Sequence, residues 1–301
     1  MMTKPVHWFI SRFFLPDCSD YNPLSVRRAC RSKRQARSAF KANHLPYAKG
    51  RVFFNPAKAF AFVKSAGFPV VVKPNVGGFS RGAYFPIHSK TALLKAVLGV
   101  KKYWPVSVVE QYLSGKNYRI VITKFGVMSV LRRYPPFVIG DGVQTISALI
   151  DVENALRRDR QLMPVTRLIP KNSAIKKHLK QQNKSLATVL DAGHKVELHH
   201  KIALKLGASV EVLDKRVLNQ NNSKKLKQIL DFFDANILGI DVICQQGLEI
   251  DFEAQNCIFL ELNARPFLKM HDKPRYGKAE ELSHFYQQLD ALHITDNEKY
   301  Y

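Results

Sequence analysis

The alternation of apolar and polar residues along the chain predicts a mixture of short strands and helices, with no internal repeat. Short apolar runs rich in β-branched residues predict strands at 69–74, 106–112, 118–124, 127–133, 237–244 and 257–262. Capping residues and helical spacing predict helices at 26–42, 55–67, 89–103, 145–158 and 223–233. The stretch 170–205 is polar and weakly patterned. Because strands and helices mix without regular strand-helix-strand alternation, the pattern favours an α+β fold over a doubly wound sheet.

Local signals predict where three of these helices begin. Asn55 is a good N-cap, Pro56 suits the first helical position, and Gly67 is expected to end that helix. Ser89 is the predicted cap of the next helix. Ser223 is the predicted cap of a strongly amphipathic helix near the C-terminal end.

The charge of the chain is large and unevenly placed. Its 301 residues include 47 Lys and Arg against 24 Asp and Glu, a formal net charge of +23. Hydrophobic residues at 46% allow a packed core and exclude wholesale disorder. From 21 to 109 there is no Asp or Glu, while 17 Lys and Arg fall there. This basic stretch therefore indicates an acidic partner or substrate.

Cysteine usage and the N-terminal segment bear on where the protein works. The four cysteines, Cys18, Cys30, Cys244 and Cys257, form no CxxC pair and no zinc spacing, so we expect reduced thiols and a cytoplasmic setting. No apolar run reaches the ~18 residues that cross a bilayer. The aromatic residues of 8–14 are expected to pack against the body of the protein. Peripheral contact with a membrane surface is the alternative.

The first segment with chemical character is a strand that ends in Lys73 and opens into the glycine-rich loop 75–83. Glycines allow backbone amides to approach an anion closely, and Lys73 and Arg81 can neutralise phosphate oxygens. The loop also contains Gly77, Gly78 and Gly82 and leads into a further strand. It matches neither the P-loop nor the dinucleotide fingerprint, so a plain flexible loop remains an alternative.

A second segment, VVEQYLSGKNYRIVI, carries Glu110 on a strand and Asn117 beyond a polar kink. The edge of a strand offers the alternating N–H and C=O groups that an adenine ring can bond, and Asn117 could bond ribose hydroxyls. Taken alone, these residues are also compatible with an ordinary strand.

A third segment places hard oxygen ligands near each other. Glu261 and Asn263 lie two residues apart, so in a strand both side chains face the same way, and a neighbouring strand could bring Asp241 beside them. Two carboxylates and an amide oxygen suit Mg²⁺. The alternative is that both carboxylates form salt bridges with Arg265 or with lysines, since buried charges need partners.

Together, the order of Lys33, VVVKP with its glycine-rich loop, VVEQYL, GID and ELNARP resembles the ATP-grasp superfamily of carboxylate-amine ligases. Within it, the chain most resembles the ATP-grasp module of cyanophycin synthetase and bifunctional glutathione synthetase. The segments RYPPFVIGDGVQTISALID, NALRRDR and KMHDKPRYGK support this resemblance in the same order, and it covers about 33–280.

The resemblance implies two α+β lobes that clasp ATP, with a much shortened N-terminal region. It implies an N-terminal extension at 1–30, a first lobe at 31–112, a second lobe with the metal site at 113–285, and a tail at 286–301. The implied ATP-binding residues are Lys33, Lys73, Gly77, Gly78, Arg81, Gly82, Glu110, Gln111, Leu113 and Asn117, where Asn117 replaces the usual acidic ribose ligand. The implied metal ligands are Asp241, Glu261 and Asn263, and the implied catalytic residues are Arg119, Arg133 and His271.

The resemblance also implies an activity. An enzyme of this kind joins a carboxylate to an amine through an acyl phosphate, using ATP and one or two Mg²⁺ ions, for which Mn²⁺ can substitute. Its partners would be small amino acids or peptides, with an anionic substrate and a homodimer left open. A kinase that stops at phosphorylation and a non-catalytic basic nucleotide-binding module are the alternatives. A nucleic-acid partner is not favoured, because the chain carries no recognisable RNA- or DNA-reading motif.

Overall fold

The computed structural model describes residues 8–9, 12–13, 19–76 and 82–300, which divide into two compact units. Unit 1 comprises 1–130, 214–268 and 282–301, and unit 2 comprises 131–213 and 269–281. Helices and antiparallel sheets are mixed, as expected of an α+β fold. The lobe boundaries implied at residues 30, 112 and 285 stay predictions.

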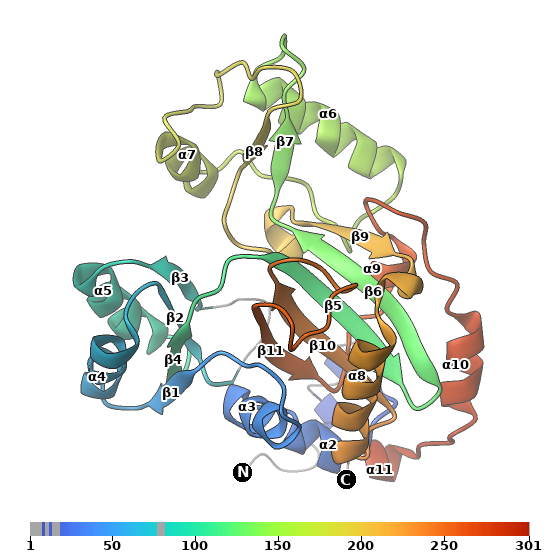
Figure 1. The fold of residues 1–301 in the computed structure, drawn as a ribbon. Helices are drawn as coiled ribbons and strands as arrows, with labels where there is room; N and C mark the ends of the chain where they lie inside the picture. The colour runs from blue at the N-terminus through green and yellow to red at the C-terminus, as the bar shows by residue number, and fades with distance from the viewer. Residues whose placement is uncertain (1–7, 10–11, 14–18, 77–81, 301) are drawn as a thin grey trace. The chain divides into compact units, whose positions relative to one another are not determined.

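The first sheet of unit 1 is antiparallel, with strand order β1-β4-β2-β3 (Figure 1). Its strands are β1 (Gly50–Phe53), β2 (Val70–Pro74), β3 (Tyr84–Ile87) and β4 (Ser107–Gln111). Helices α4 (Ala57–Ala66) and α5 (Lys90–Val100) pack on one face, where their apolar residues and those of the strands form one core. Burial of this apolar surface is the main force that holds the layer together.

The ends of these two helices follow the capping signals of the sequence. The Asn55 side chain accepts a hydrogen bond from the backbone N–H of Ala57, and α4 ends at Gly67, whose φ of 76° favours glycine. The Ser89 side chain accepts a bond from the N–H of Ala92 at the start of α5. The predicted starts are thus confirmed to within two residues.

The second sheet contains the long strands of unit 1. Its strands run in the order β11-β10-β5-β6, with β5 (Lys116–Thr123), β6 (Gly126–Tyr134), β10 (Ile237–Cys244) and β11 (Cys257–Asn263), and β6 extends into unit 2. The pairs β5–β10 and β10–β11 are antiparallel. Unit 1 also contains η2 (Lys215–Val217), α8 (Gln220–Phe232), α10 (Ser283–Asp290) and α11 (Asp296–Tyr300).

The helix predicted over 26–42 is wrong as a single element. The structure has α2 (Leu24–Ala29) and α3 (Lys33–Ala42), separated by a short break. Ser32 causes the second start, since its side chain and that of Gln35 form a reciprocal capping box. Arg27 and Arg28 therefore lie on α2, Arg34 and Arg37 lie on α3, and Arg31 lies in the break between the two helices.

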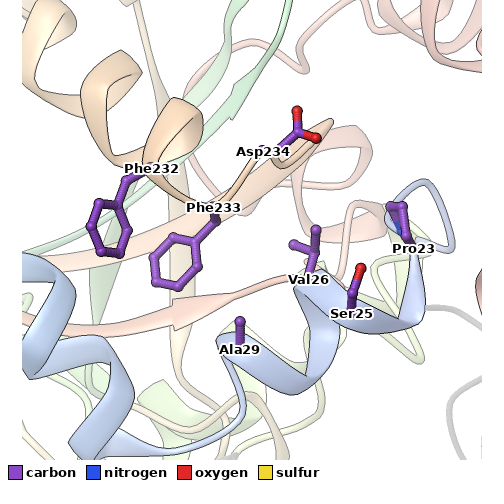
Figure 2. A pocket seen from close by; sticks show the side chains of 7 residues that line it. All are labelled: Pro23, Ser25, Val26, Ala29, Phe232, Phe233 and Asp234. Atoms are coloured by element: carbon purple, nitrogen blue, oxygen red, sulfur yellow. The ribbon is translucent and has the colours of Figure 1, made fainter.

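The cap predicted at Ser223 is also wrong. Asn219 caps α8 by accepting a hydrogen bond from the N–H of Asn222, so the helix begins before Ser223. At the other end of α8, Phe232, Phe233 and α2 line an apolar cavity of about 360 Å³ (Figure 2).

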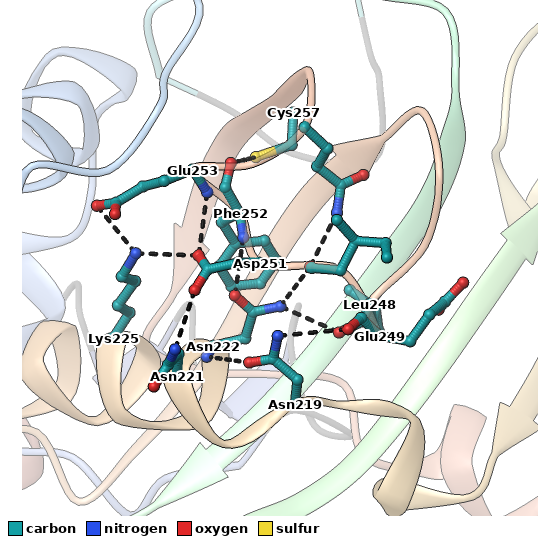
Figure 3. Close-up of polar contacts among 12 residues, drawn as sticks. Asn219, Asn221, Asn222, Lys225, Leu248, Glu249, Asp251, Phe252, Glu253 and Cys257 are labelled. Atoms are coloured by element: carbon teal, nitrogen blue, oxygen red, sulfur yellow. Dashed lines mark hydrogen bonds and ion pairs between the residues drawn. The ribbon is translucent and has the colours of Figure 1, made fainter.

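A polar network ties α8 to the segment that connects β10 to β11 (Figure 3). The buried Asn222 donates to the carbonyl oxygens of Leu248 and Ile250 and accepts from the N–H of Phe252. Lys225 donates to Asp251 at 3.1 Å. Because this network holds the connection in place, it supports the register of the two strands it joins.

Unit 2 is smaller and has its own core. Its elements are β7 (Phe137–Ile139), β8 (Lys195–Glu197), β9 (Ser209–Leu213), α6 (Ile146–Asp159), α7 (Ser173–Lys180), α9 (Lys269–Asp272) and η1 (Leu204–Leu206). β7 and β8 form an antiparallel pair, and α6 and α7 contribute to the core beside them. The weakly patterned stretch 170–205 contains α7, β8 and the start of η1, all of them short, which explains its faint signal.

A buried arginine organises this unit. Arg157 is 1% exposed and donates to the Glu153 carboxylate, to the carbonyl oxygens of Arg167 and Gly207, and to the hydroxyl of Ser209. Arg275 binds both oxygens of the same carboxylate, at 2.9 and 2.7 Å. Burial opposes ionisation of Glu153, but the bonds from Arg275 and then Arg157 outweigh it and lower the pKa of this carboxyl group.

The cysteines and the N-terminal residues complete the fold. Cys30, Cys244 and Cys257 are buried free thiols, as predicted, and Cys18 lies outside the described residues. Trp8, Phe9 and Phe13 are exposed, so the prediction that they pack against the body is wrong for these three. None of the helices in the described ranges is long and apolar enough to cross a bilayer.

Candidate active site

Three of the predicted site residues form a row across the second sheet. In the strand register, Asp241 on β10 lies opposite Arg119 on β5 and opposite Glu261 on β11. Arg119 binds both oxygens of Asp241, with Nε to Oδ1 at 2.7 Å and Nη2 to Oδ2 at 2.8 Å. Its Nη2 also lies 3.9 Å from Oε1 of Glu261. The predicted neighbourhood of Asp241 and Glu261 is thus confirmed.

Lys33 contacts this row, and Asn263 lies beside it, opposite Gly239 in the strand register. The ammonium of Lys33, at the first position of α3, lies 3.5 Å from Oε2 of Glu261. Asn263 follows Glu261 by two residues and donates to the carbonyl oxygen of Gly239 at 3.3 Å. Both carboxylates are therefore ion-paired, as in the alternative: Glu261 pairs with a lysine, Lys33, and Asp241 pairs with Arg119 in place of Arg265. Arg265 instead binds Asp20 at 2.7 Å.

A second group of charges lies on the first sheet. Lys73 on β2 forms an ion pair with Glu110 on β4, and the register makes the two residues diagonal neighbours. Arg37 of α3 approaches the same carboxylate, with Nη1 4.0 Å from Oε2. The Glu110 side chain is almost fully buried, so it needs these cations. The sequence indicated Glu110 as a nucleotide-facing residue but did not predict this pairing.

Arg37 is the residue that sequence reasoning missed. Its Nη1 is buried, and no described group accepts a hydrogen bond from it. The available signal was its spacing, because Arg37 follows Lys33 by one helical turn, which places both on one face of α3. Gly50 leaves room for it, since a Cβ there would lie 2.7 Å from Arg37 Nη1 and 2.5 Å from the carbonyl oxygen of Val109.

The remaining predicted ATP-binding residues lie around these charges or outside the described residues. Gln111 ends β4 and donates its N–H to the carbonyl oxygen of Lys49, Leu113 follows that strand, and Asn117 is buried on β5. Gly82 is described, with a φ of 70°. Gly77, Gly78 and Arg81 lie outside the described residues.

Two of the predicted catalytic residues belong to unit 2. Arg133 lies near the end of β6, and His271 is fully buried on α9. Their roles stay predictions.

The donor set fits a hard divalent cation. Asp241, Glu261 and Asn263 offer carboxylate and amide oxygens on two paired strands, and Glu261 keeps 26% of its side chain exposed. Within the described part of the chain, no three His, Cys, Asp or Glu residues form a metal cluster. A cation held here would thus have two carboxylates and an amide, which leaves positions for water and phosphate oxygens.

Comparison with known proteins agrees with this site. No family profile matches the chain. The chain is 26% identical over 261 residues to cyanophycin synthetase of Synechocystis sp. (strain ATCC 27184 / PCC 6803 / Kazusa), covering 84% of this chain and 29% of that protein. It is 26% identical over 257 residues to the glutathione biosynthesis bifunctional protein GshAB of Desulfotalea psychrophila, covering 83% and 32%. The chain thus spans about a third of the length of these relatives.

Solved structures show the same fold. A bifunctional glutathione synthetase from Pasteurella multocida superimposes with a TM-score of 0.59 at 18% identity, covering 86% of this chain and 36% of that one. The ATP-grasp ligase PsnB, complexed with its minimal precursor, gives a TM-score of 0.51 at 13% identity, covering 91% and 63%. The chain therefore has the ATP-grasp fold. Within that class, its sequence is similar to the cyanophycin synthetases and the bifunctional glutathione-biosynthesis proteins, as the motifs indicated.

Proposed function

We propose that the chain is an ATP- and Mg²⁺-dependent ligase that joins the carboxylate of an amino acid or peptide to an amine. The observation that carries this proposal is the position of α3 within unit 1. This helix directs Lys33 to Glu261 of the second sheet and Arg37 to Glu110 of the first sheet. One helix thereby links the two charge clusters. On an ATP-grasp fold, we propose that these linked clusters hold the nucleotide.

In the proposed reaction, a substrate carboxylate attacks the γ-phosphate of ATP, ADP leaves, and an acyl phosphate forms. An amine then attacks the acyl carbon, loses a proton and displaces inorganic phosphate. No protein nucleophile is needed, so the contribution of the chain is to position the reactants and stabilise charge. Lys33, Lys73 and Arg119 would exchange part of their pairing with carboxylates for pairing with phosphate oxygens.

The proposed metal ligands are Asp241, Glu261 and Asn263. Bound Mg²⁺ would supply charge neutralisation of the phosphate oxygens. Arg119 and Lys33 provide positive charge to the same carboxylates, and the two hydrogen bonds from Arg119 hold the Asp241 side chain in place. This arrangement accounts for two carboxylates so close together on adjacent strands.

A screen of acceptors tests the proposal. Purified protein is incubated with Mg-ATP and pairs drawn from amino acids and short peptides, and the products are read by mass. A ligase releases ADP and phosphate only with the right pair, and its product is lighter by one water than the sum of the acceptors. ADP with a phosphorylated product would instead indicate a kinase. A thermal shift with ATP and no turnover for any pair would indicate a binding module.

A further inference from the structure

The outer surface of α4 and α5 carries apolar side chains that the core does not use. Leu94 and Leu98 lie one helical turn apart on α5 and are 47% and 58% exposed, while Leu93 and Val97 of the same helix are buried in the core. Phe54, just before α4, is 71% exposed. Isolated exposed leucines are common, but a pair on one helix face beside an exposed aromatic ring is a patch.

The two helices and the turn after α5 also carry exposed lysines. Lys58 and Lys64 are exposed on α4, and Lys95 and Lys102 are exposed on α5 and the turn that follows it. The first sheet and its two helices hold one carboxylate, Glu110, which is buried against Lys73 and Arg37 and therefore offers these lysines no acidic partner. Because α4 and α5 pack on the same face of this sheet (Figure 1), their lysines share one outward surface. The proposed active site accounts for Lys33, Arg37 and Lys73 but not for these lysines.

We propose that this surface, the outer face of α4 and α5, docks onto a membrane that contains anionic lipids. Lysines attract anionic headgroups from a distance, and Leu94 and Leu98 enter the boundary between the headgroups and the acyl chains. Because α4 and α5 carry lysines and no acidic residue, no negative side chain on them repels the anionic headgroups.

The composition of the surface favours lipid over a protein or nucleic-acid partner. Its basic side chains on α4 and α5 are all lysines, which are depleted at protein interfaces, where arginine is enriched. Leu94 and Leu98 cannot stack on bases as aromatic rings and arginines do in single-stranded nucleic-acid sites, although the Phe54 ring could. Lysine beside protruding leucine is typical of peripheral membrane surfaces.

The test is binding of the full chain to phosphatidylcholine vesicles with and without phosphatidylserine, measured by co-sedimentation. We expect binding only to vesicles with phosphatidylserine. It should weaken when ionic strength rises from about 0.1 M to about 1 M, because the Debye length falls from about 10 Å to about 3 Å.

Two double variants separate the contribution of the lysine charges from that of the leucine side chains. Replacing both lysines, Lys95→Gln with Lys102→Gln, should weaken partition about 30-fold, since each lysine contributes about 1 kcal/mol. Replacing both leucines, Leu94→Ser with Leu98→Ser, should weaken it about tenfold and leave the salt dependence in place. The matched control is Lys176→Gln with Lys177→Gln on α7, which are exposed lysines of unit 2 and should have no effect. Unchanged melting temperature and ATP binding show that each variant is folded.

Three results would overturn the proposal. The first is equal binding to vesicles with and without phosphatidylserine. The second is an equal loss of binding in the α7 control. The third is binding that the leucine variant leaves intact and that RNA abolishes, because this would assign the surface to nucleic acid.

Discussion

The two units of the molecule each contain a buried group of charges, and the groups differ in how fully they are satisfied. In unit 2, the Arg157 guanidinium makes four hydrogen bonds of 3.0 Å or less within the chain, and Arg275 binds both oxygens of Glu153. In unit 1, Arg119 also binds both oxygens of Asp241, at 2.7 and 2.8 Å, but Arg37 lies 4.0 Å from Glu110.

The difference indicates which cluster holds the fold and which binds a ligand. A guanidinium whose donors all face carbonyl, hydroxyl and carboxylate oxygens stabilises its surroundings and has little left to offer a substrate. In unit 1, the buried Nη1 of Arg37 has no hydrogen-bond acceptor among the described residues, so this donor is available for a phosphate oxygen. We therefore propose that the cluster of unit 2 serves stability and that the cluster of unit 1 binds the nucleotide.

The largest expected effect is at Glu261. Replacing it in Glu261→Ala removes a proposed metal ligand, and turnover of ATP should fall by at least ~10²- to 10³-fold, because such electrostatic contacts act mainly in the transition state. The fold should persist, as Glu261 is only partly buried. Phosphate release and circular dichroism measure the two effects. The control is Glu253→Ala, an exposed carboxylate on the β10–β11 connection. Normal turnover in a folded Glu261 variant would remove this residue from the metal site.

At Arg157 we expect a loss of stability without a loss of ATP binding. Replacing it in Arg157→Met leaves buried carbonyl oxygens and part of Glu153 unpaired, which should lower the free energy of unfolding by about 3–5 kcal/mol. ATP affinity of the folded protein should not change. Denaturant unfolding and nucleotide titration measure both quantities. Arg158→Met, at an exposed position on the same helix, should change stability by less than ~0.5 kcal/mol. A stable Arg157 variant with weakened ATP binding would reverse our assignment.

A smaller effect, on ATP affinity, is expected at Arg37. Arg37→Ala removes a buried donor near Glu110, while Lys73 still pairs with that carboxylate. ATP affinity should fall about tenfold, equivalent to about 1.4 kcal/mol, with little change in stability. Fluorescence titration with a nucleotide analogue measures the affinity. Arg34→Ala, an exposed arginine on the same helix, is the control and should not change it. Equal affinities of the two variants would contradict a nucleotide contact at Arg37.

The smallest expected effect concerns three stacked histidines in unit 2. The rings of His199 and His200 lie 4.6 Å apart, and His178 lies within 6.1 Å of both. Burial first, then neighbouring charges that include Lys201, lower the pKa of His199 and His200 to about 4. The unfolded chain, with an ordinary pKa of 6.5, takes up protons first as the pH falls. This contribution to stability is therefore present above pH 6.5 and is lost between pH 6.5 and about 4.

Melting temperature against pH measures this loss. His199→Gln with His200→Gln should flatten the slope between pH 6.5 and 4. His284→Gln, at an exposed position in unit 1, should leave the slope as in the wild type. A slope that is the same in all three proteins would show that these two histidines do not titrate as described.

The outline of the fold was predictable wherever local signals were strong. Asn55, Gly67 and Ser89 act through neighbouring backbone groups, so the ends of α4 and α5 follow from the sequence. The cap at Asn219 was missed because Asn219 and Ser223 both precede apolar residues at helical spacing. Only the observed hydrogen bond from the N–H of Asn222 to the Asn219 side chain shows which of the two residues caps the helix.

The site was predictable in part for the same reason. Glu261 and Asn263 are neighbours along one strand, and the motif order suggested that Asp241 would join them. The pairing of Glu110 with Lys73 and Arg37 depends on the register of two strands and on where α3 lies, which no local pattern encodes. The surplus of basic residues was visible at once, whereas its separation into nucleotide-facing and outward side chains required the structure.

The most direct test of the proposed ligase reaction uses carboxylates labelled with oxygen-18. The reaction contains unlabelled Mg-ATP, the labelled carboxylate and the amine found by screening. The inorganic phosphate that it releases is analysed by mass spectrometry. Attack of the carboxylate on the γ-phosphate predicts that one labelled oxygen appears in the phosphate whenever an amide product forms. Amide product with unlabelled phosphate would contradict the acyl phosphate mechanism.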